Sequence, residues 1–141
     1  MKPRLVRRMV DPSNAKDQRI EPEVLHETAV NPAHLELVIA AMQDVNLMGT
    51  AQSVFARSGY SSAGKTGTSQ VIGIKQNERY DAKRIAERHR DHSLYVAFAP
   101  VEAPRIALAV IVENGGFGAQ AAAPIARKVL DHHLLSQRGQ R

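Results

Sequence analysis

The residues best suited to chemistry lie between positions 63 and 71, in the segment Ala-Gly-Lys-Thr-Gly-Thr-Ser-Gln-Val. Lys65 supplies a positive charge, and Thr66 and Thr68 supply hydroxyl groups that can donate hydrogen bonds. An ammonium group beside hydroxyls and backbone N–H groups suits an anionic ligand. Because glycine and β-branched residues disfavour helix, the segment predicts a β-strand. A glycine within a strand, such as Gly67, often marks a place where a ligand or another backbone comes close.

Residues 59–66 also match the phosphate-binding pattern G-x-x-x-x-G-K-[ST] of P-loop nucleotide-binding proteins. That pattern requires a buried strand before the first glycine and a helix that opens at the lysine. Residues 52–58 form a poor core strand, and the residues after Lys65 have no helical period. The apolar run 106–112 could imitate the acidic strand that holds magnesium, but it ends in Glu113 instead of aspartate. P-loop nucleotide binding remains the alternative interpretation.

Lys65-Thr66-Gly67 can also be the Lys-Thr-Gly box of penicillin-recognising enzymes. Three letters alone are weak evidence, but further segments follow in order. They are 63–70, Tyr80-Asp81-Ala82, Ile85-Ala86-Glu87-Arg88, Arg90-Asp91-His92, Ala97-Phe98-Ala99-Pro100, and Glu113-Asn114-Gly115-Gly116 followed by Gly118. This series closely resembles the C-terminal end of class B penicillin-binding proteins, of the penicillin-binding protein 2 type, from about Pro3 to Leu135.

The resemblance implies a peptidoglycan D,D-transpeptidase of cell elongation and cell shape. In such an enzyme a serine attacks a D-Ala-D-Ala stem peptide, and the resulting acyl-enzyme passes its acyl group to an amine. β-Lactams acylate the same serine. The resemblance implies that Lys65 supports proton transfer and attracts the substrate carboxylate. It also implies that Thr66 and Thr68 form hydrogen bonds with that carboxylate. Gly67 would leave room for substrate along the strand edge, and the backbone N–H of Thr68 would be one of two oxyanion donors.

Two other motifs of the family's catalytic domain, S-x-x-K and S-x-N, precede the Lys-Thr-Gly strand. Here S-x-x-K occurs at Ser13–Lys16, within a turn signature, and at Ser62–Lys65, on the predicted strand. Residues three apart on a strand face opposite sides, so Ser62 and Lys65 cannot form the catalytic pair. S-x-N does not occur. We therefore expect a C-terminal piece of the transpeptidase domain that is inactive alone. Its nucleophile and membrane anchor would belong to a preceding part, at the periplasmic face of the bacterial inner membrane.

Composition excludes some chemistry and leaves one further alternative. The chain has 141 residues, no cysteine and a net charge of +5. Because no aromatic platform or recognition motif accompanies the basic residues, we do not expect nucleic-acid binding, although a basic interaction module stays open. His89 and His92 flank Asp91 at a ligand-like spacing, and His132 adjoins His133. Since zinc needs three or four clustered ligands, we expect no metal and no cofactor, and we expect Asp91 and His92 to anchor a loop.

The elements predict an α+β fold, an antiparallel sheet with helices on both faces. Residues 1–30 should form a hairpin and a connection, residues 31–58 should be helical, and residues 59–113 should form three strands with a long loop at 72–92. A short helix is predicted from Asp81 to about Arg88, a closing helix at 119–135 and a frayed tail at 136–141. Helical spacing places two apolar stripes in the core. They are Leu35, Val38, Ile39, Met42 and Val45, and Ile125, Val129, Leu130 and Leu134.

The expected partners follow from the resemblance: peptidoglycan stem peptides, β-lactams and the cell-elongation machinery. In the family, the strand that resembles residues 105–113 pairs with a strand from earlier in the chain. If that partner is missing, an apolar sheet edge is left exposed. We therefore expect this chain to self-associate through that edge, to exchange strands or to be poorly stable.

Overall fold

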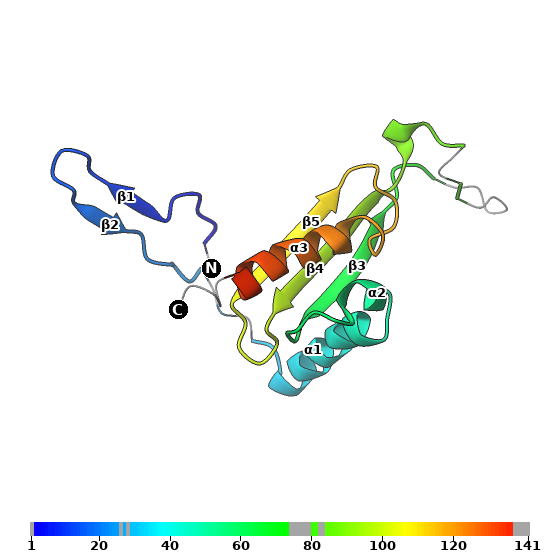
Figure 1. Cartoon of the computed structure of the whole chain (residues 1–141), viewed down its shortest axis with the longest axis horizontal. Coiled ribbons are helices and arrows are strands. Elements are labelled where there is room, and N and C mark those ends of the chain that lie inside the picture. The colour runs from blue at the N-terminus through cyan, green and yellow to red at the C-terminus, as the bar shows by residue number, and fades with distance from the viewer. Residues whose placement is uncertain (1, 26, 28, 74–79, 82–83, 137–141) are drawn as a thin grey trace. The chain divides into compact units, whose positions relative to one another are not determined.

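The structure is a computed structural model that describes residues 2–25, 27, 29–73, 80–81 and 84–136 (Figure 1). The chain divides into two compact units, Met1–Pro32 and Ala33–Arg141. Within the described residues, no helix is both long and apolar enough to cross a membrane.

The first unit contains an antiparallel hairpin, with strands β1 (Arg8–Val10) and β2 (Asp17–Arg19). The turn between them is organised by Asp11. Its carboxylate accepts hydrogen bonds from the backbone N–H of Ser13 at 2.9 Å, the Ser13 hydroxyl at 2.6 Å and the Asn14 amide at 2.9 Å. These donors, the Ser13 hydroxyl first, hold the pKa of Asp11 below its usual value. The hairpin follows the turn signature in the sequence.

Helix α1 (Pro32–Leu47) begins at the predicted Asn-Pro start, and a short helix α2 (Gln52–Phe55) follows. The core packing predicted for the first apolar stripe is wrong at two positions, since Leu35 and Val38 are 50% and 54% exposed. Only the last turns of α1 reach the core, where Val45 is partly buried and Asn46 is buried. The early turns have no element to pack against among the described residues.

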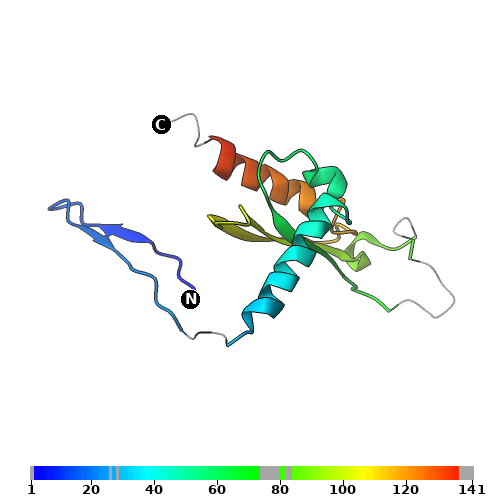
Figure 2. The ribbon, with the colours of Figure 1, turned by 90° about the horizontal axis from the view of Figure 1, so that it is seen from below.

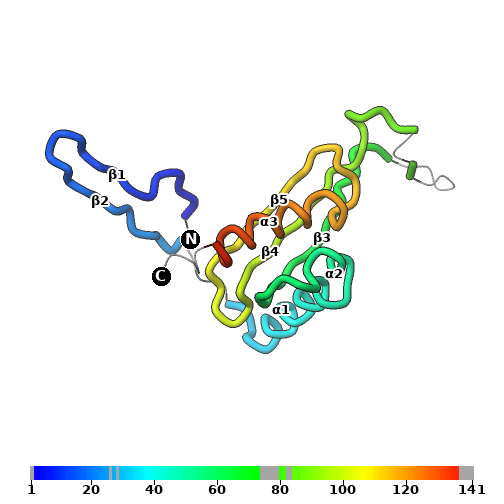
Figure 3. Tube along the Cα trace, viewed as in Figure 1, coloured from blue at the N-terminus to red at the C-terminus, as the bar shows by residue number. Residues whose placement is uncertain are grey.

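The second unit is built on a three-stranded antiparallel sheet in the order β3-β4-β5 (Figure 3). Its strands are β3 (Ala63–Ser69), β4 (His92–Ala99) and β5 (Ile106–Val112). Thr66 lies opposite Tyr95, which in turn lies opposite Val110. The sheet and its helices confirm the α+β class.

Helix α3 (Ala122–Leu135) covers one face of the sheet and begins three residues later than predicted. Its predicted stripe is correct for Leu130 and Leu134 but wrong for Ile125 and Val129, which are 45% and 44% exposed. Three alanines take their place in the core: Ala122, Ala123 and Ala126. Small side chains let the helix approach the sheet closely, so the bulkier residues lie at its flanks. The alanines pack with alternate residues of β4, namely Tyr95, Ala97 and Ala99.

The opposite face of the sheet is more open. Figure 2 shows α3 on one side of the strands and most of α1 on the other, so helices lie on both sides as expected. However, α1 runs beside β3 and leaves the middle of this face uncovered (Figures 1 and 2). Val96 is 45% exposed and Ile111 is 65% exposed. The strands are apolar on both faces, but the described residues bury only one of them.

The described residues from 84 to 88 do not form the α-helix predicted between Asp81 and about Arg88. Positions 82–83 lie outside the described residues, and the backbone N–H of Arg84 donates to the carbonyl of Asp81 in a turn. Ala86 is extended, with ψ 139°, which prevents helix from continuing through it. Only a single turn of 3₁₀ helix follows, η1 (Glu87–His89). The few apolar residues of this segment provide too little buried surface to hold a longer helix.

Candidate functional site

Strand β3 presents Lys65 and the two threonines on opposite faces of one sheet edge. Lys65 lies opposite Val96, whereas Thr66 and Thr68 lie opposite Tyr95 and Ser93. Paired residues of an antiparallel sheet project to the same side, so Lys65 belongs to the open face and the threonines to the face of α3. Because β3 is an edge strand of the described sheet, groups from both faces can reach a ligand beside it.

The Lys65 side chain is exposed, and its Nζ donates a hydrogen bond to the carbonyl of Thr66 at 2.7 Å. No ion pair to this ammonium group forms within the described part of the chain. A lysine ammonium has three donor hydrogens, and this contact uses one of them. The charge therefore remains available to an anionic group at the strand edge.

Thr66 is held from outside the sheet by Thr50, in the link between α1 and α2. Their hydroxyl oxygens lie 2.9 Å apart, and either can be the donor. Thr66 is half-buried, whereas Thr68 is exposed. Thr50 carries no signal in the sequence, because no motif connects two residues sixteen positions apart. A threonine directly after the glycine that ends a predicted helix is too common to be a signal.

The start of β3 is fixed by a buried polar network around Asn46. The Asn46 amide donates to the Ser62 hydroxyl at 2.9 Å, and its oxygen accepts the Tyr95 hydroxyl at 2.5 Å. Burial raises the pKa of Tyr95 to about 12. Gly64 makes this arrangement possible, since a Cβ there would lie 2.1 Å from the Tyr95 hydroxyl oxygen. The network ties α1 to the two strands that carry the site.

The loop after β5 packs closely on the middle of the site. A Cβ on Gly118 would lie 2.4 Å from the carbonyl oxygen of Leu94 and 2.6 Å from that of Gly67. The Ser93 hydroxyl donates to the Phe117 carbonyl at 3.1 Å and accepts the Ala122 N–H at 3.0 Å. The close backbone approach expected near Gly67 is thus made by this loop, which supports β3 from the α3 side.

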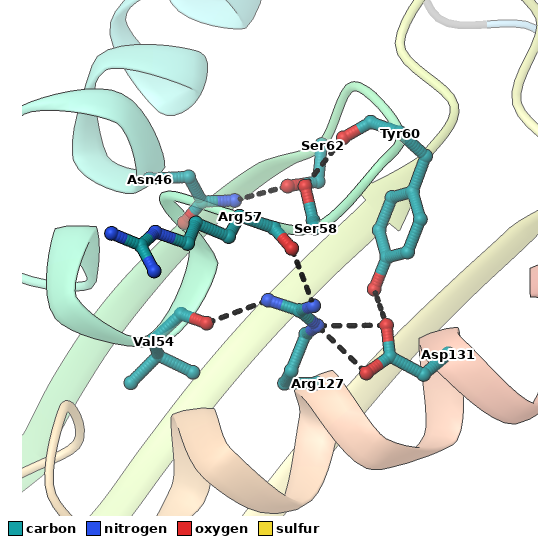
Figure 4. A network of polar contacts seen from close by, with 8 residues as sticks. All are labelled: Asn46, Val54, Arg57, Ser58, Tyr60, Ser62, Arg127 and Asp131. Atoms are coloured by element: carbon teal, nitrogen blue, oxygen red, sulfur yellow. Dashed lines mark hydrogen bonds and ion pairs between the residues drawn. The ribbon is translucent and has the colours of Figure 1, made fainter.

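A second network connects α2, the segment before β3 and α3 (Figure 4). Arg127 pairs with Asp131 through Nε at 2.7 Å, and its terminal nitrogens donate to the carbonyls of Val54 at 2.7 Å and Arg57 at 3.0 Å. The Tyr60 hydroxyl donates to Asp131 at 2.8 Å. Burial first, and then the hydrogen bond to Asp131, raise the pKa of Tyr60. This network fixes the chain that enters β3.

Asp91 and His92 anchor chain segments through hydrogen bonds, as expected. The buried Asp91 carboxylate accepts the Val71 N–H at 3.4 Å, and its carbonyl accepts the Gly116 N–H at 2.8 Å. His92 Nδ1 accepts the Asn114 N–H at 3.0 Å. Across the described ranges, no group of three or more His, Cys, Asp or Glu side chains is arranged to hold a metal ion.

The P-loop interpretation is wrong. Lys65 lies in the middle of β3, whereas a P-loop lysine opens a helix.

The second S-x-x-K match is also not a catalytic pair. Ser62 is 6% exposed and its hydroxyl accepts the Asn46 amide, while Lys65 lies on the open face. The first match is not on a helix either, since the Ser13 hydroxyl donates to Asp11 within the hairpin turn.

Comparison with known proteins identifies relatives along most of the chain. Residues 1–131 match the family model of the penicillin binding protein transpeptidase domain. Peptidoglycan D,D-transpeptidase MrdA of Escherichia coli K12 is 45% identical over 129 residues, 87% of this chain and 20% of that protein. MrdA of Acinetobacter baumannii is 46% identical over 98 residues, 70% of this chain and 14% of that protein. The chain thus spans about a fifth of the length of these relatives, or less.

Solved structures give a similar result. Pseudomonas aeruginosa PBP2, in complex with WCK 5153, matches with a TM-score of 0.65 and 39% identity over 82% of this chain and 23% of that one. PBP2 from Helicobacter pylori, in complex with MreC, matches with a TM-score of 0.59 and 26% identity over 77% of this chain and 19% of that one.

Proposed function

Because this chain belongs to the penicillin-binding protein transpeptidase family, we propose that it forms the Lys-Thr-Gly side of a peptidoglycan D,D-transpeptidase active site. The observation that carries the proposal is the placement of Lys65-Thr66-Gly67-Thr68 along an edge strand, beside an exposed ammonium group without an ion pair among the described residues. The substrate would be a stem peptide ending in D-Ala-D-Ala, and β-lactams would bind as its mimics.

We assign the carboxylate end of the substrate to the threonine hydroxyls. Thr66 and Thr68 share one face of β3, two residues apart, so their side chains are about 7 Å apart along the strand. Lys65 would act from the other face of the same edge, supplying charge to the carboxylate and to proton transfer at the nucleophile. The backbone N–H of Thr68 would donate to the oxyanion. Gly67 would let the substrate lie along the strand.

The acyl-accepting serine and the S-x-N motif would come from residues outside this chain. A serine nucleophile needs an adjacent base, and neither S-x-x-K match here pairs a serine with a lysine. We therefore expect no transpeptidase activity and no covalent penicillin adduct from the 141-residue chain alone. Full activity would require the Lys-Thr-Gly strand of this chain and the part that carries the serine to form one active site.

A chimera tests this proposal. The matching 129 residues of E. coli MrdA would be replaced by the corresponding residues of this chain, and the product incubated with a fluorescent penicillin. The label should survive denaturing electrophoresis in the chimera and be absent from the chain alone. Replacing Lys65→Met in the chimera should slow labelling by about 100-fold or more, whereas Lys128→Met should leave the rate unchanged.

Two results would contradict the proposal. One is covalent labelling of the 141-residue chain itself. The other is a Lys65→Met chimera that is labelled as fast as its parent. Circular dichroism and size-exclusion chromatography would establish that each chimera is folded before rates are compared, so that a lost label is not mistaken for a lost fold.

Location and partners follow from the same family membership. We propose that the intact protein acts at the periplasmic face of the bacterial inner membrane, anchored by a segment outside this chain. It would work with the cell-elongation machinery, a view supported by the H. pylori PBP2 structure that contains MreC. We also propose that the isolated chain self-associates, because β5 is an edge strand whose apolar Ile111 is exposed.

A further inference from the structure

Thr50 lies outside every motif named above, yet it contacts the central hydroxyl of the site. Its Oγ1 is 2.9 Å from Oγ1 of Thr66. Both partners are held by their own elements. Backbone hydrogen bonds fix the chain on either side of Thr50. The N–H of Gly49 donates to the backbone carbonyl of Asp44 at 2.8 Å, and the N–H of Ala51 donates to that of Val45 at 3.0 Å. Thr66 is fixed in β3 opposite Tyr95. The contact therefore joins two anchored segments.

The direction of the hydrogen bond in this pair decides whether Thr66 can donate a hydrogen bond to another group. A hydroxyl has one hydrogen to donate and two lone pairs to accept with. If Thr66 donates to Thr50, it has no hydrogen left for another acceptor. If Thr50 donates to Thr66, the Thr66 hydrogen is free. An ionised carboxylate only accepts hydrogen bonds, so it can use Thr66 only in the second arrangement.

We propose that Thr50 is a positioning residue that donates its hydroxyl hydrogen to Thr66 and so directs the Thr66 hydrogen toward the substrate carboxylate. The inference rests on the proposed function, because it takes the carboxylate of a D-Ala-D-Ala peptide as the ligand of Thr66. Thr50 does not touch the ligand. It holds the Thr66 hydroxyl in one rotamer and polarises it, since hydrogen bonds in a chain strengthen one another.

The substitution Thr50→Val tests this inference with little change in shape, because valine keeps the branched side chain and removes the hydroxyl. Thr50 is exposed, so the variant should fold like the parent. Thr50→Ser restores the hydroxyl and is the rescue variant. If valine disturbs the fold, Thr50→Ala removes the same hydroxyl with a smaller side chain.

The ¹⁵N- and ¹³C-labelled 141-residue chain supplies two NMR readouts. Three-bond couplings to the Thr66 methyl report its rotamer, which should be single in the parent and in Thr50→Ser and averaged in Thr50→Val. Titration with N-acetyl-D-Ala-D-Ala, followed at the Thr66 and Thr68 amides, should show affinity lowered about 3- to 10-fold in Thr50→Val and restored in Thr50→Ser. The same dipeptide with a C-terminal amide is the control, and its binding should not depend on Thr50.

The outcomes separate the two claims. If the parent binds the dipeptide carboxylate but Thr50→Val binds it equally well, or keeps a single Thr66 rotamer, the role of Thr50 is overturned and the proposed function stands. If the dipeptide shifts neither the Thr66 nor the Thr68 amide signal of the parent at any concentration, the Thr66 hydroxyl does not bind the carboxylate in this chain and the role of Thr50 is overturned, whereas the labelling of the chimera decides the proposed function. Equal loss of carboxylate and amide binding in Thr50→Val would indicate only a structural effect and would also overturn the inference.

Discussion

Arg127 and Asp131 form an ion pair one turn apart on α3, with the Arg127 Nε 2.7 Å from a carboxylate oxygen. The same guanidinium lies over the rings of Phe55 and Tyr60, at 5.8 Å from each ring centroid, and it donates to two backbone carbonyls before β3 (Figure 4). The Arg127 side chain thus connects α2 and the segment before β3 to α3.

Replacing Arg127→Met should lower the free energy of unfolding by about 2–3 kcal/mol, because it leaves Asp131 and two carbonyl groups without this donor. Urea denaturation followed by circular dichroism measures the change. Lys128→Met, at an exposed position of the same helix, is the matched control and should change stability by less than about 0.5 kcal/mol. Equal effects of the two substitutions would show that the contacts of Arg127 do not stabilise the fold.

Gly64→Ala should be strongly destabilising. The new methyl group would lie 2.1 Å from the Tyr95 hydroxyl oxygen and 2.6 Å from its ring carbon Cζ, and Tyr95 is fully buried. Moving that ring would break its bond to Asn46, so we expect a loss of about 3 kcal/mol or more, measured as a fall in thermal midpoint. Gly73→Ala is the control, because a Cβ there meets nothing within 4 Å. A Gly64→Ala protein as stable as the parent would contradict the packing described for β3 and β4.

The stability of the fold should decrease at alkaline pH. Burial raises the pKa of Tyr95 from 10.0 to about 12, so the folded state keeps a proton that the unfolded chain loses in this range. Stability from this group is therefore complete below about pH 10 and declines by about 2–3 kcal/mol as pH approaches 12. The raised pKa of Tyr60 acts in the same direction.

Urea denaturation across this pH range measures the slope. Tyr95→Phe should be less stable than the parent at neutral pH, since Asn46 loses a hydrogen bond, but its stability should fall less steeply above about pH 10. Parallel pH curves for the parent and Tyr95→Phe would mean that the Tyr95 hydroxyl does not titrate differently in the folded and unfolded states.

The isolated chain should associate as its concentration rises, through the open edge and face of β5. Ile111→Lys places a charge on that face, where the side chain is 65% exposed, and should shift association to about tenfold higher concentration. Static light scattering gives the mass at each concentration. Val129→Lys adds the same charge on α3 and should leave the association of the parent unchanged. A parent chain that stays monomeric throughout would refute the expected self-association.

Much of the local structure was determined by short-range sequence features. The hairpin turn at Asp11, the start of α1 at Pro32 and the strand at Lys65 follow from turn residues, a proline at the first helical position and β-branched residues. These signals act between near neighbours, so they hold whatever surrounds them. The ordered motifs after Lys65 also indicated the family, which the match over residues 1–131 confirms.

These short-range features could not predict which residues are buried. The apolar stripes of α1 and α3 have the same period whether or not another element covers them, so Leu35 and Ile125 were expected in the core and are exposed. Ala122 and Ala126 took core positions instead, because the distance between helix and sheet decides which side chains fit. That distance is a property of the packed elements.

The sequence by itself determined which residue types stand on the site strand, and hence the chemistry that they can offer. Only the tertiary structure decided which other groups act on them: Thr50 against Thr66, and Asn46 against Ser62. Each of these pairs is sixteen residues apart, joined through a helix end, a short helix and a turn. A hydrogen bond requires two atoms within about 3 Å, and over such a separation this closeness is set by the folding of everything between them.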